Sequence, residues 1–461
     1  MLSSISEPID FKATPAVLAA VLEELELLGE RSGGAVPPRV RREALAAYQH
    51  SLRERTRFPA RWRHDYAALT FDDLRWSSGR TRVPAGVLRA AAVPSDDAAG
   101  TGADVPALAL ENAGGIAHFG STYLEPEERS GDARVTLLSL ADAQRRLPLR
   151  VAPIHQQLIA PAADRFTALS TAFQNCGVYV EIPEGAVLDA PLQLLWSSAP
   201  GEASAVFPHT VVRVGKNARA KIVERHLGET ESFVAGTVEI ELGAGARLDY
   251  VVVQQADDGA RLFVRRTARC AEGSRVGWHL AELGGALTRS VVDVRLAGPR
   301  AGAEINAFFF ARGFAHADLV TDLDHAASET NSVTVVRGAA SGRGHGRFTG
   351  GIRIRPEARR CEASMRDDAL VLSRDAYVDA VPALEIAASD ARAYHAATVG
   401  SLSEEELFYV QSRGIARLAA ERMIALAFFE PVIVRFPSLA LRDEVRTVLD
   451  AYLDEVPGTF T

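Results

Sequence analysis

The chain has 461 residues, of which 47% are hydrophobic and 24% charged, and its formal net charge is −8. This balance is ordinary for a globular protein with two or three structural regions, and it argues against nonspecific binding to nucleic acid. Residues 1–12 have no basic head followed by an apolar run, and no charge-free stretch reaches bilayer-spanning length. We therefore expect a cytoplasmic protein with no membrane segment.

Helical signals come first along the chain. Residues 14–29 carry an apolar face at helical spacing, which follows Thr14-Pro15 and ends at Gly29. A second helical stretch follows Pro37-Pro38 and runs to about Phe58, and the Ala-, Gly-, Asp- and Pro-rich residues 79–105 suggest a linker. We expect a helical and mixed N-terminal region over residues 1–165.

From Phe166 to Gly400 the pattern becomes that of β-strands. Runs such as Val178–Ile182 and Thr237–Leu242 alternate between side chains that suit opposite faces of a sheet. A turn residue followed by Ala or Ser recurs in this region, at Gly185-Ala186, Asn217-Ala218, Gly245-Ala246, Gly273-Ser274 and Gly302-Ala303, with later echoes at Glu357-Ala358, Asp375-Ala376 and Asp390-Ala391.

The first five small residues of this repeat are separated by 32, 28, 28 and 29 positions. A near-constant period indicates stacked coils, because strands this short bury their apolar face only by stacking on the next coil. We therefore predict a mainly β fold, a parallel β-helix (solenoid) over residues 166–400. A β-sandwich would explain the period less well.

Helical signals return after Gly400. Ser403 and Glu406 fit a capping box, Gly414 fits a helix stop, and two further helices are expected from Ile415 and after Ser438. We expect residues 401–461 to be helical and to cover an open end of the solenoid.

Three groups of residues in the C-terminal half now allow a comparison with a known family. The run Leu407–Ile415, preceded by His395–Gly400 and Pro382–Ile386, closely resembles the C-terminal signature of the SufB/SufD family. Further similarity lies at Val223–Leu227, Gly284–Leu287, Asp322–Ala327 and Phe348–Gly350 followed by Arg355-Pro356, with a weaker echo at Trp62-Arg63. The resemblance covers roughly residues 166–429.

The resemblance implies a right-handed parallel β-helix between helical segments, in a non-catalytic scaffold subunit. SufB and SufD pair through their β-helices, and each C-terminal helical region docks an ABC-type ATPase, SufC. The complex assembles a nascent iron-sulfur cluster from iron and persulfide sulfur, and reduced flavin is associated with it. By the same resemblance, the ATPase-docking residues here are Leu407, Phe408, Tyr409, Arg413, Gly414 and Ile415.

The string around His395 resembles SufD more than SufB. It reads Ala393-Tyr394-His395-Ala396, so the histidine is present and the glutamate that follows it in the SufB pattern is absent. Ala393 stands where the SufD pattern has a thiol, and Ala396 where it has a glycine. His395 is therefore the candidate cluster ligand, with further ligands from the partner, because a neutral imidazole can bind iron. The alternative is a hydrogen-bonded structural histidine.

Other candidate groups have plainer interpretations. Cys361 adjoins Arg359 and Arg360, which would favour its thiolate if it were exposed, but we expect it to be buried and inert, like Cys176 and Cys270. The three cysteines form no Cys-x-x-Cys pair, so neither a disulfide framework nor a self-contained metal site is indicated. The spacing of His316, His325 and His345 matches no local metal motif, so we expect structural or surface roles for them.

The apolar residues of the C-terminal helices have two interpretations, packing on the solenoid and docking of a partner. We expect Leu418, Met423 and Leu426 to belong to the core. Two alternative functions stay open beside the scaffold. One is a SufB/SufD-like homodimer that brings two copies of His395 together. The other is a β-helical carbohydrate-active enzyme with a groove lined by acidic and basic residues.

Overall fold

The structure is a computed structural model that describes Glu23 and residues 36–53, 75–76, 114–119, 122–124, 134–197, 204–228 and 232–454. The helix expected over residues 14–29, except Glu23, the linker over 79–105 and the Trp62-Arg63 echo lie outside the described residues.

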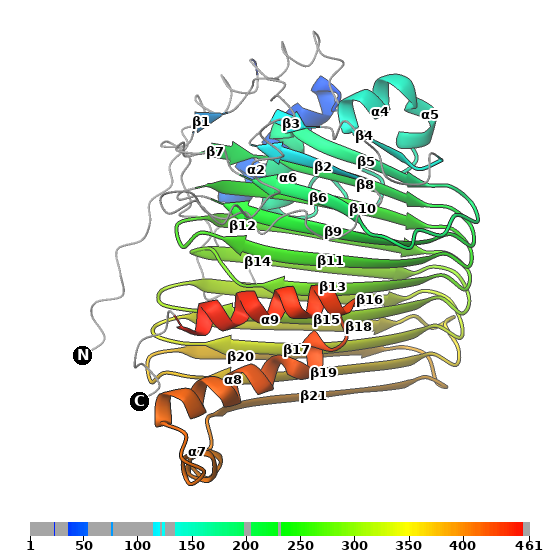
Figure 1. Ribbon diagram of the computed structural model, residues 1–461. Helices are drawn as coiled ribbons and strands as arrows, with labels where there is room; N and C mark the ends of the chain where they lie inside the picture. The colour runs from blue at the N-terminus through cyan, green and yellow to red at the C-terminus, as the bar shows by residue number, and fades with distance from the viewer. Residues whose placement is uncertain are drawn as a thin grey trace.

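Two long sheets stack face to face and form a flattened coil (Figure 1). Sheet A is 11-stranded and contains β1 Arg75–Trp76, β4 Thr136–Ser139, β5 Cys176–Ile182, β7 Ser204–Val206, β8 Pro208–Val214, β10 Phe233–Leu242, β12 Arg261–Cys270, β14 Leu287–Leu296, β16 His316–His325, β18 His345–Ile354 and β20 Tyr377–Ile386. Sheet B is 10-stranded and contains β2 Gly114–Phe119, β3 Thr122–Leu124, β6 Leu192–Ser197, β9 Arg219–Gly228, β11 Arg247–Ala256, β13 Arg275–Glu282, β15 Gly302–Ala311, β17 Asn331–Ala340, β19 Glu362–Val371 and β21 Arg392–Ser401.

From β8 onward the long strands of the two sheets alternate along the chain, and each pairs in parallel with the strand one coil earlier. His316 in β16, for example, lies in register with His345 in β18, which lies in register with Tyr377 in β20. Within the described residues, the antiparallel pairs are β2 with β3 and β4 with β5, both at the N-terminal end. The prediction of a parallel β-solenoid with helical regions at both ends is confirmed, and the β-sandwich alternative is wrong.

The core lies between the two sheets, where inward-facing Val, Ile, Leu and aromatic side chains stack from coil to coil. Trp278, Phe309 and Phe348 are among the largest of them, and each is almost fully buried. Because parallel register keeps equivalent residues on the same face, one inward position per strand defines a column through the whole solenoid.

Left-handed turn residues form a ladder along one edge of the solenoid. The backbone has a positive φ at Gly185, Asn217, Gly245 and Gly273, as the repeat predicted, and then at Arg300, Glu329 and Arg360. The backbone N–H of Gly245 donates to Glu272 O, and this bond to the next coil recurs along the ladder. The fifth predicted unit, Gly302-Ala303, is wrong by two residues, because Arg300-Ala301 makes the turn and Gly302 begins β15.

Helices cover the outer face of sheet A at its first coils. The pair α2 (Pro38–Arg53) and α6 (Arg165–Phe173) packs on these coils through a cluster of phenylalanines that includes Phe166, Phe207 and Phe263. Two short helices, α4 (Leu140–Arg146) and α5 (Pro148–Val151), lie beside β4. Since α6 is helical, the first strand of the region expected to be β from Phe166 onward begins at Cys176.

A buried carboxylate ties the segment after α5 to sheet A. Glu239 in β10 is fully buried, and its oxygens accept hydrogen bonds from the backbone N–H groups of Gln156 (2.5 Å), Gln157 (3.0 Å) and Leu158 (2.8 Å). His209 Nε2 lies 3.0 Å from the same carboxylate. Gln156 has a positive φ, so the segment turns sharply to place these three donors around one side chain.

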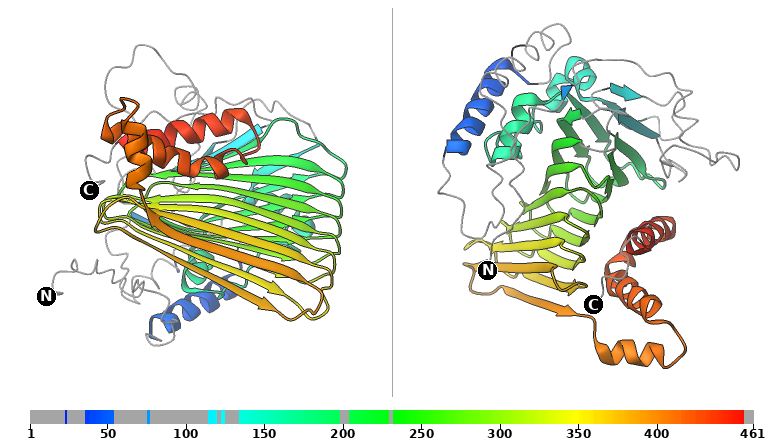
Figure 2. Two further views of the ribbon diagram at one scale, coloured as in Figure 1. Left: turned by 90° about the horizontal axis from the view of Figure 1, so that it is seen from below. Right: turned by 90° about the vertical axis from the view of Figure 1, so that its left-hand side faces the viewer.

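The C-terminal helices are α7 (Glu404–Gln411), α8 (Arg417–Ile433) and α9 (Leu439–Asp454). Figure 2 shows α8 and α9 against the outer face of sheet B, beside the solenoid rather than over its end. They cover the outward side chains of that sheet, where Phe308 meets Phe429 and Phe436. The expectation that these helices cover the open end is wrong, because sheet B itself presents an apolar outer face that needs burial.

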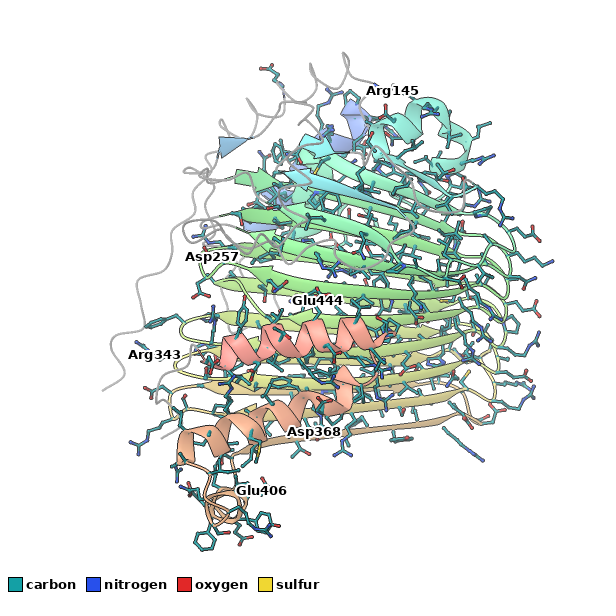
Figure 3. The ribbon with its side chains drawn as sticks, viewed as in Figure 1. Arg145, Asp257, Arg343, Asp368, Glu406 and Glu444 are labelled. Carbon is teal, nitrogen blue, oxygen red and sulfur yellow. The ribbon has the colours of Figure 1, made fainter. Side chains whose placement is uncertain are left out.

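A bidentate ion pair connects α9 to the solenoid. The guanidinium of Arg225 in β9 donates to both carboxylate oxygens of Glu444 at 3.1 and 2.8 Å, and Figure 3 labels Glu444 on α9 where it lies over sheet B. None of the described helices has the length and apolar character needed to cross a membrane.

Candidate functional site at the open end of the solenoid

The last coil ends in strands that pair on one side only. β20 pairs with β18 and β21 pairs with β19, and no strand among the described residues pairs with their other edges. Most of β21 is exposed, including Tyr394 at 68% and Val399 at 49%. A long strand edge with free backbone N–H and C=O groups is a template for pairing with another chain.

His395 lies in the middle of this exposed strand. It is in register with Met365 of β19, whose side chain belongs to the interior core, so His395 occupies an inward-facing position at the solvent-open mouth of the solenoid. Ala393 and Ala397, the inward neighbours on either side, are small and leave the imidazole uncrowded along the strand. The arrangement exposes one imidazole beside an unpaired strand edge.

Directly below the terminal strand lies an acidic side chain that the sequence analysis did not single out. Asp367 in β19 is 1% exposed and shares the inward face with Met365 and Ala369. Neither of its carboxylate oxygens has a hydrogen-bond partner among the described residues. Burial, with a contribution from Asp368, raises the pKa of Asp367 to about 7. The sequence alone does not distinguish Asp367 from its neighbour Asp368, which faces outward and pairs with Arg337. Only the alternation of side chains along β19 shows that Asp367 faces the interior.

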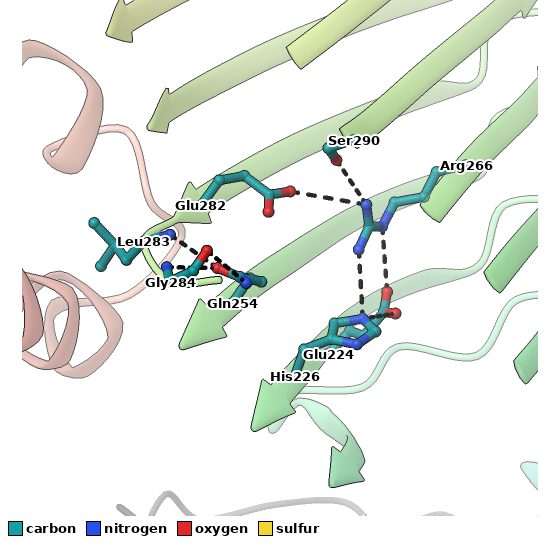
Figure 4. A network of polar contacts seen from close by, with 8 residues as sticks. All are labelled: Glu224, His226, Gln254, Arg266, Glu282, Leu283, Gly284 and Ser290. Carbon is teal, nitrogen blue, oxygen red and sulfur yellow. Dashed lines mark hydrogen bonds and ion pairs between the residues drawn. The ribbon is translucent and has the colours of Figure 1, made fainter. Parts of the chain in front are cut away.

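A second polar group lies deep in the interior, several coils away (Figure 4). Arg266 of β12 faces Glu224 (3.5 Å) and His226 (3.5 Å) of β9, and it donates to Ser290 at 2.8 Å. His226 Nε2 lies 2.6 Å from Glu224 Oε1. Burial alone would raise the pKa of Glu224, but Arg266 and His226 outweigh it and hold the pKa at about 2.

Alternation along β9 therefore divides the resemblance string Val223–Leu227 between two surfaces. Glu224 and His226 face the interior network, whereas Arg225 faces out to Glu444 on α9. Each charged side chain of Val223–Leu227 has an oppositely charged or hydrogen-bonding partner. These partners offset the cost of burying the charges, so we interpret the network as structural.

The cysteines are buried or nearly so. Cys270 and Cys361 are fully buried, and Cys361 Sγ lies 3.2 Å from Thr330 Oγ1 and 3.4 Å from Ala327 O. Burial raises the pKa of Cys270 to about 12 and that of Cys176 well above its usual value. Burial therefore disfavours the thiolate forms of Cys176 and Cys270.

The solenoid brings together two of the three histidines that the spacing had separated. The rings of His316 and His345, in adjacent coils, meet edge to face with their centroids 4.4 Å apart, and the His345 ring lies tilted against that of Tyr377 at 4.0 Å. His325 lies at the other end of β16, buried and within 2.8 Å of Thr330 and Ser332 hydroxyls. No group of three His, Cys, Asp or Glu side chains within the described ranges could hold a metal ion.

The α7 segment presents an exposed apolar surface beyond the solenoid. Leu407 is buried, while Phe408 and Tyr409 are 73% and 60% exposed. Arg413 donates to the hydroxyl of Tyr409, Gly414 has a positive φ after the helix, and Ile415 is partly exposed. Ser403 caps α7 by accepting from the Glu406 N–H, as the capping box predicted.

On α8, two of three expected core residues are wrong. Leu418 is 55% exposed and Met423 is exposed, whereas Leu426 packs partly against the core between sheet B and the helices. The buried face of α8 runs instead through Ala425, Phe429 and Val432, because sheet B meets the helix from that side. Leu418 and Met423 are therefore exposed apolar side chains on α8, as Phe408 and Tyr409 are on α7.

Residues 196–428 match the family model described as the SUF system FeS cluster assembly SufBD core domain, which is half of the chain. The chain belongs to this family. It is 28% identical to an iron-sulfur cluster assembly SufBD family protein of Mycobacterium leprae, over 59% of this chain and 32% of that protein.

Two further relatives have similar values. The iron-sulfur cluster assembly protein SufB of Bacillus subtilis is 27% identical over 61% of each chain, and a SufBD family protein of Staphylococcus epidermidis is 27% identical over 60% of this chain and 61% of the relative. The chain thus spans less than two thirds of the length of these curated relatives. Its recognition as a SufB/SufD family member from residues 382–415 and their neighbours is confirmed.

Proposed function

We propose that this SufBD family protein is a SufD-type, non-catalytic scaffold subunit of a complex that assembles iron-sulfur clusters. The observation that carries this function is the exposed terminal strand β21, which holds His395 at an open, unpaired solenoid end. Proteins usually cover or block exposed strand edges, because such edges pair with other chains. An uncovered edge of this length therefore favours a protein that works with a partner.

The partner at this end is a SufB-like subunit. Tyr394, Val399 and Ile386 expose apolar area on the two terminal strands, and strand pairing across the edge would bury it while satisfying the free backbone groups. His395 then contributes one ligand to a nascent cluster, and the partner supplies thiolate ligands, because the described cysteines of this chain are buried or nearly so. The cluster is the cargo of the complex and is shared only transiently.

The ATPase partner docks on α7 and the start of α8. Phe408, Tyr409 and Leu418 are exposed apolar side chains of α7 and the start of α8, and the Arg413 guanidinium lies over the Tyr409 ring. Aromatic side chains and arginine of this kind are the usual anchors of protein interfaces. We propose a SufC-like ABC-type ATPase as the occupant. Reduced flavin belongs to the proposed complex, and we assign none of the described residues to it.

Affinity purification of the tagged chain under anaerobic conditions, with identification of the recovered proteins, tests this function. We expect a SufB-like and a SufC-like protein to be recovered. The double variant Val399→Arg and Tyr394→Arg should release the first and keep the second, and Phe408→Ala with Tyr409→Ala should do the reverse.

Two outcomes would contradict the proposed subunit. Recovery of only further copies of this chain would favour the SufB/SufD-like homodimer, joined through the same strand edge. Cleavage of polysaccharide by the purified chain would favour the carbohydrate-active enzyme and refute the scaffold.

A further inference from the structure

The strongest unexplained feature outside the proposed ligand His395 is the buried, unpaired carboxylate of Asp367. Charged groups in protein interiors are paired or bind metal ions, and an unpaired one is costly. The other charged side chains near this strand are paired: Asp368 with Arg337, and Arg366 with Asp368. Asp367 faces the opposite way, into the coil, and has neither an ion-pair nor a hydrogen-bond partner among the described residues.

The register of β19 and β21 places Asp367 next to His395 in the open mouth. Met365 pairs with His395 and Asp367 pairs with Ala397, so these four inward positions form the corners of one small patch. Adjacent strands are ~4.8 Å apart and two residues span ~6.6 Å, which puts the Cα atoms of Asp367 and His395 about 8 Å apart on the diagonal. Two side chains on the same face can both reach an ion between them at this separation.

The surroundings favour an ion at this place. Ala397, in register with Asp367 on the terminal strand, places only a methyl group on the mouth side of this carboxylate, which is itself 1% exposed. Across the coil, Gly350 contributes no side chain, and the Met365 thioether lies where a Cβ at Gly350 would be. An imidazole with a carboxylate is a donor set that suits divalent transition metals such as Fe(II), Co(II) or Zn(II).

We infer that Asp367 and His395 together bind a divalent transition-metal ion at the open mouth of the solenoid, with water or a partner residue completing the coordination. This inference deepens the proposed function and rests on it for His395, since it assigns to this chain an iron-entry site formed by two of its own side chains. Asp367 is then kept unpaired in the absence of metal because its partner is the ion.

Cobalt(II) binding by the isolated full chain tests this inference, with absorbance in the visible region and calorimetry as readouts. We expect one equivalent to bind with weak d–d bands and no thiolate charge-transfer band, because both ligands are nitrogen or oxygen donors. Asp367→Asn and His395→Ala should each weaken binding at least tenfold. The double variant should bind at least as weakly as the weaker single variant, because it lacks both donors to the ion.

Two further variants separate coordination from folding. Ala397→Leu leaves both ligands in place and fills the space above Asp367 at an exposed position, so binding should fall while the far-UV circular dichroism stays unchanged. Asp390→Asn removes an exposed carboxylate on the turn before β21 and should bind as the wild type does.

Three results would overturn the inference: no cobalt bound by the wild-type chain, unchanged binding by folded Asp367→Asn, or a thiolate charge-transfer band, which would assign the ion to a cysteine. None of them bears on the recovery of SufB-like and SufC-like partners. The proposed function can therefore stand or fall separately from this metal site.

Discussion

The buried carboxylate of Glu239 offers a direct test of how the N-terminal segment is attached to the solenoid. One oxygen accepts from Gln156 N–H and lies against His209, and the other accepts from the N–H groups of Gln157 and Leu158. Glu239→Gln keeps the shape of the side chain and replaces one acceptor oxygen by an NH2 donor.

The cost follows from which oxygen is replaced. If the amide nitrogen takes the position near Gln157 and Leu158, two backbone donors lose their acceptor. If it takes the other position, it can donate to His209 and only Gln156 N–H loses its acceptor, so this orientation is preferred. An unsatisfied buried donor costs about 1–3 kcal/mol, and the remaining bonds lose their charge assistance, so we expect a destabilisation of about 3 kcal/mol.

Hydrogen exchange of the amides of residues 156–158, together with urea denaturation, measures this cost. A loss of about 3 kcal/mol corresponds to roughly a hundredfold faster exchange if these amides open locally. Glu241→Gln is the matched control on the same strand, because Glu241 pairs with Arg269 and both side chains are partly exposed. Its cost should stay below about 1 kcal/mol. Equal effects of the two substitutions would refute the anchoring role of Glu239.

Three other predictions concern pH, the turn ladder and the C-terminal helices. Burial lowers the pKa of His325 from its ordinary value of 6.5 to about 4. Between these two pH values the unfolded chain binds a proton at His325 and the folded chain does not. The free energy of unfolding should therefore fall as the pH drops from 6.5 to 4. At pH 5 the loss in free energy of unfolding is about 2 kcal/mol. The urea midpoints at pH 7 and pH 5 should therefore differ less for His325→Gln than for the wild-type chain. Gly273→Ala should cost about 1–2 kcal/mol for its positive φ alone. Gly245→Ala should cost more in the same denaturation assay, because the new Cβ would clash with Asn217 Oδ1. Equal costs would show that the Asn217 side chain moves away. Glu444→Ala leaves the buried Arg225 guanidinium without its carboxylate, at a cost of about 3 kcal/mol, and should speed proteolytic cleavage of α9. Asp443→Ala, at an exposed ion pair next in sequence, should leave the cleavage rate unchanged.

The sequence was sufficient for the architecture because the turn residues repeat with the coil. Gly185, Asn217, Gly245 and Gly273 are residue types that favour a positive φ, so the sequence itself indicates a left-handed turn at these positions. From Arg300 onward the ladder uses Arg and Glu at the same backbone geometry, and nothing in their chemistry signals a left-handed turn. The fifth unit was therefore placed two residues too late, and the echo at Glu357-Ala358 lies three residues before the turn at Arg360. The echo at Asp375-Ala376 lies between β19 and β20, on the other edge of the solenoid.

The helices and the mouth of the solenoid were harder to predict because they depend on which face of an element meets another. The period of α8 identifies apolar residues, but only the apolar outer face of sheet B decides that Phe429 is buried and Met423 exposed. Asp367 was missed for a similar reason. Two adjacent aspartates look like an ordinary solvated pair until the strand assigns one of them to the interior and the other to Arg337.

The docking of α8 and α9 also limits how the solenoid can change in length. The two helices together rest on β9 through β19, and Glu444 reaches back to Arg225, 219 residues earlier. Inserting or deleting one coil between these strands would displace the helices from their contacts by a strand spacing of ~4.8 Å. Most solenoids tolerate extra repeats because each repeat touches only its neighbours. Here the contacts of α8 and α9 with β9 to β19 disfavour any change in the number of coils between these strands. They thereby set the distance from the first coils to the mouth.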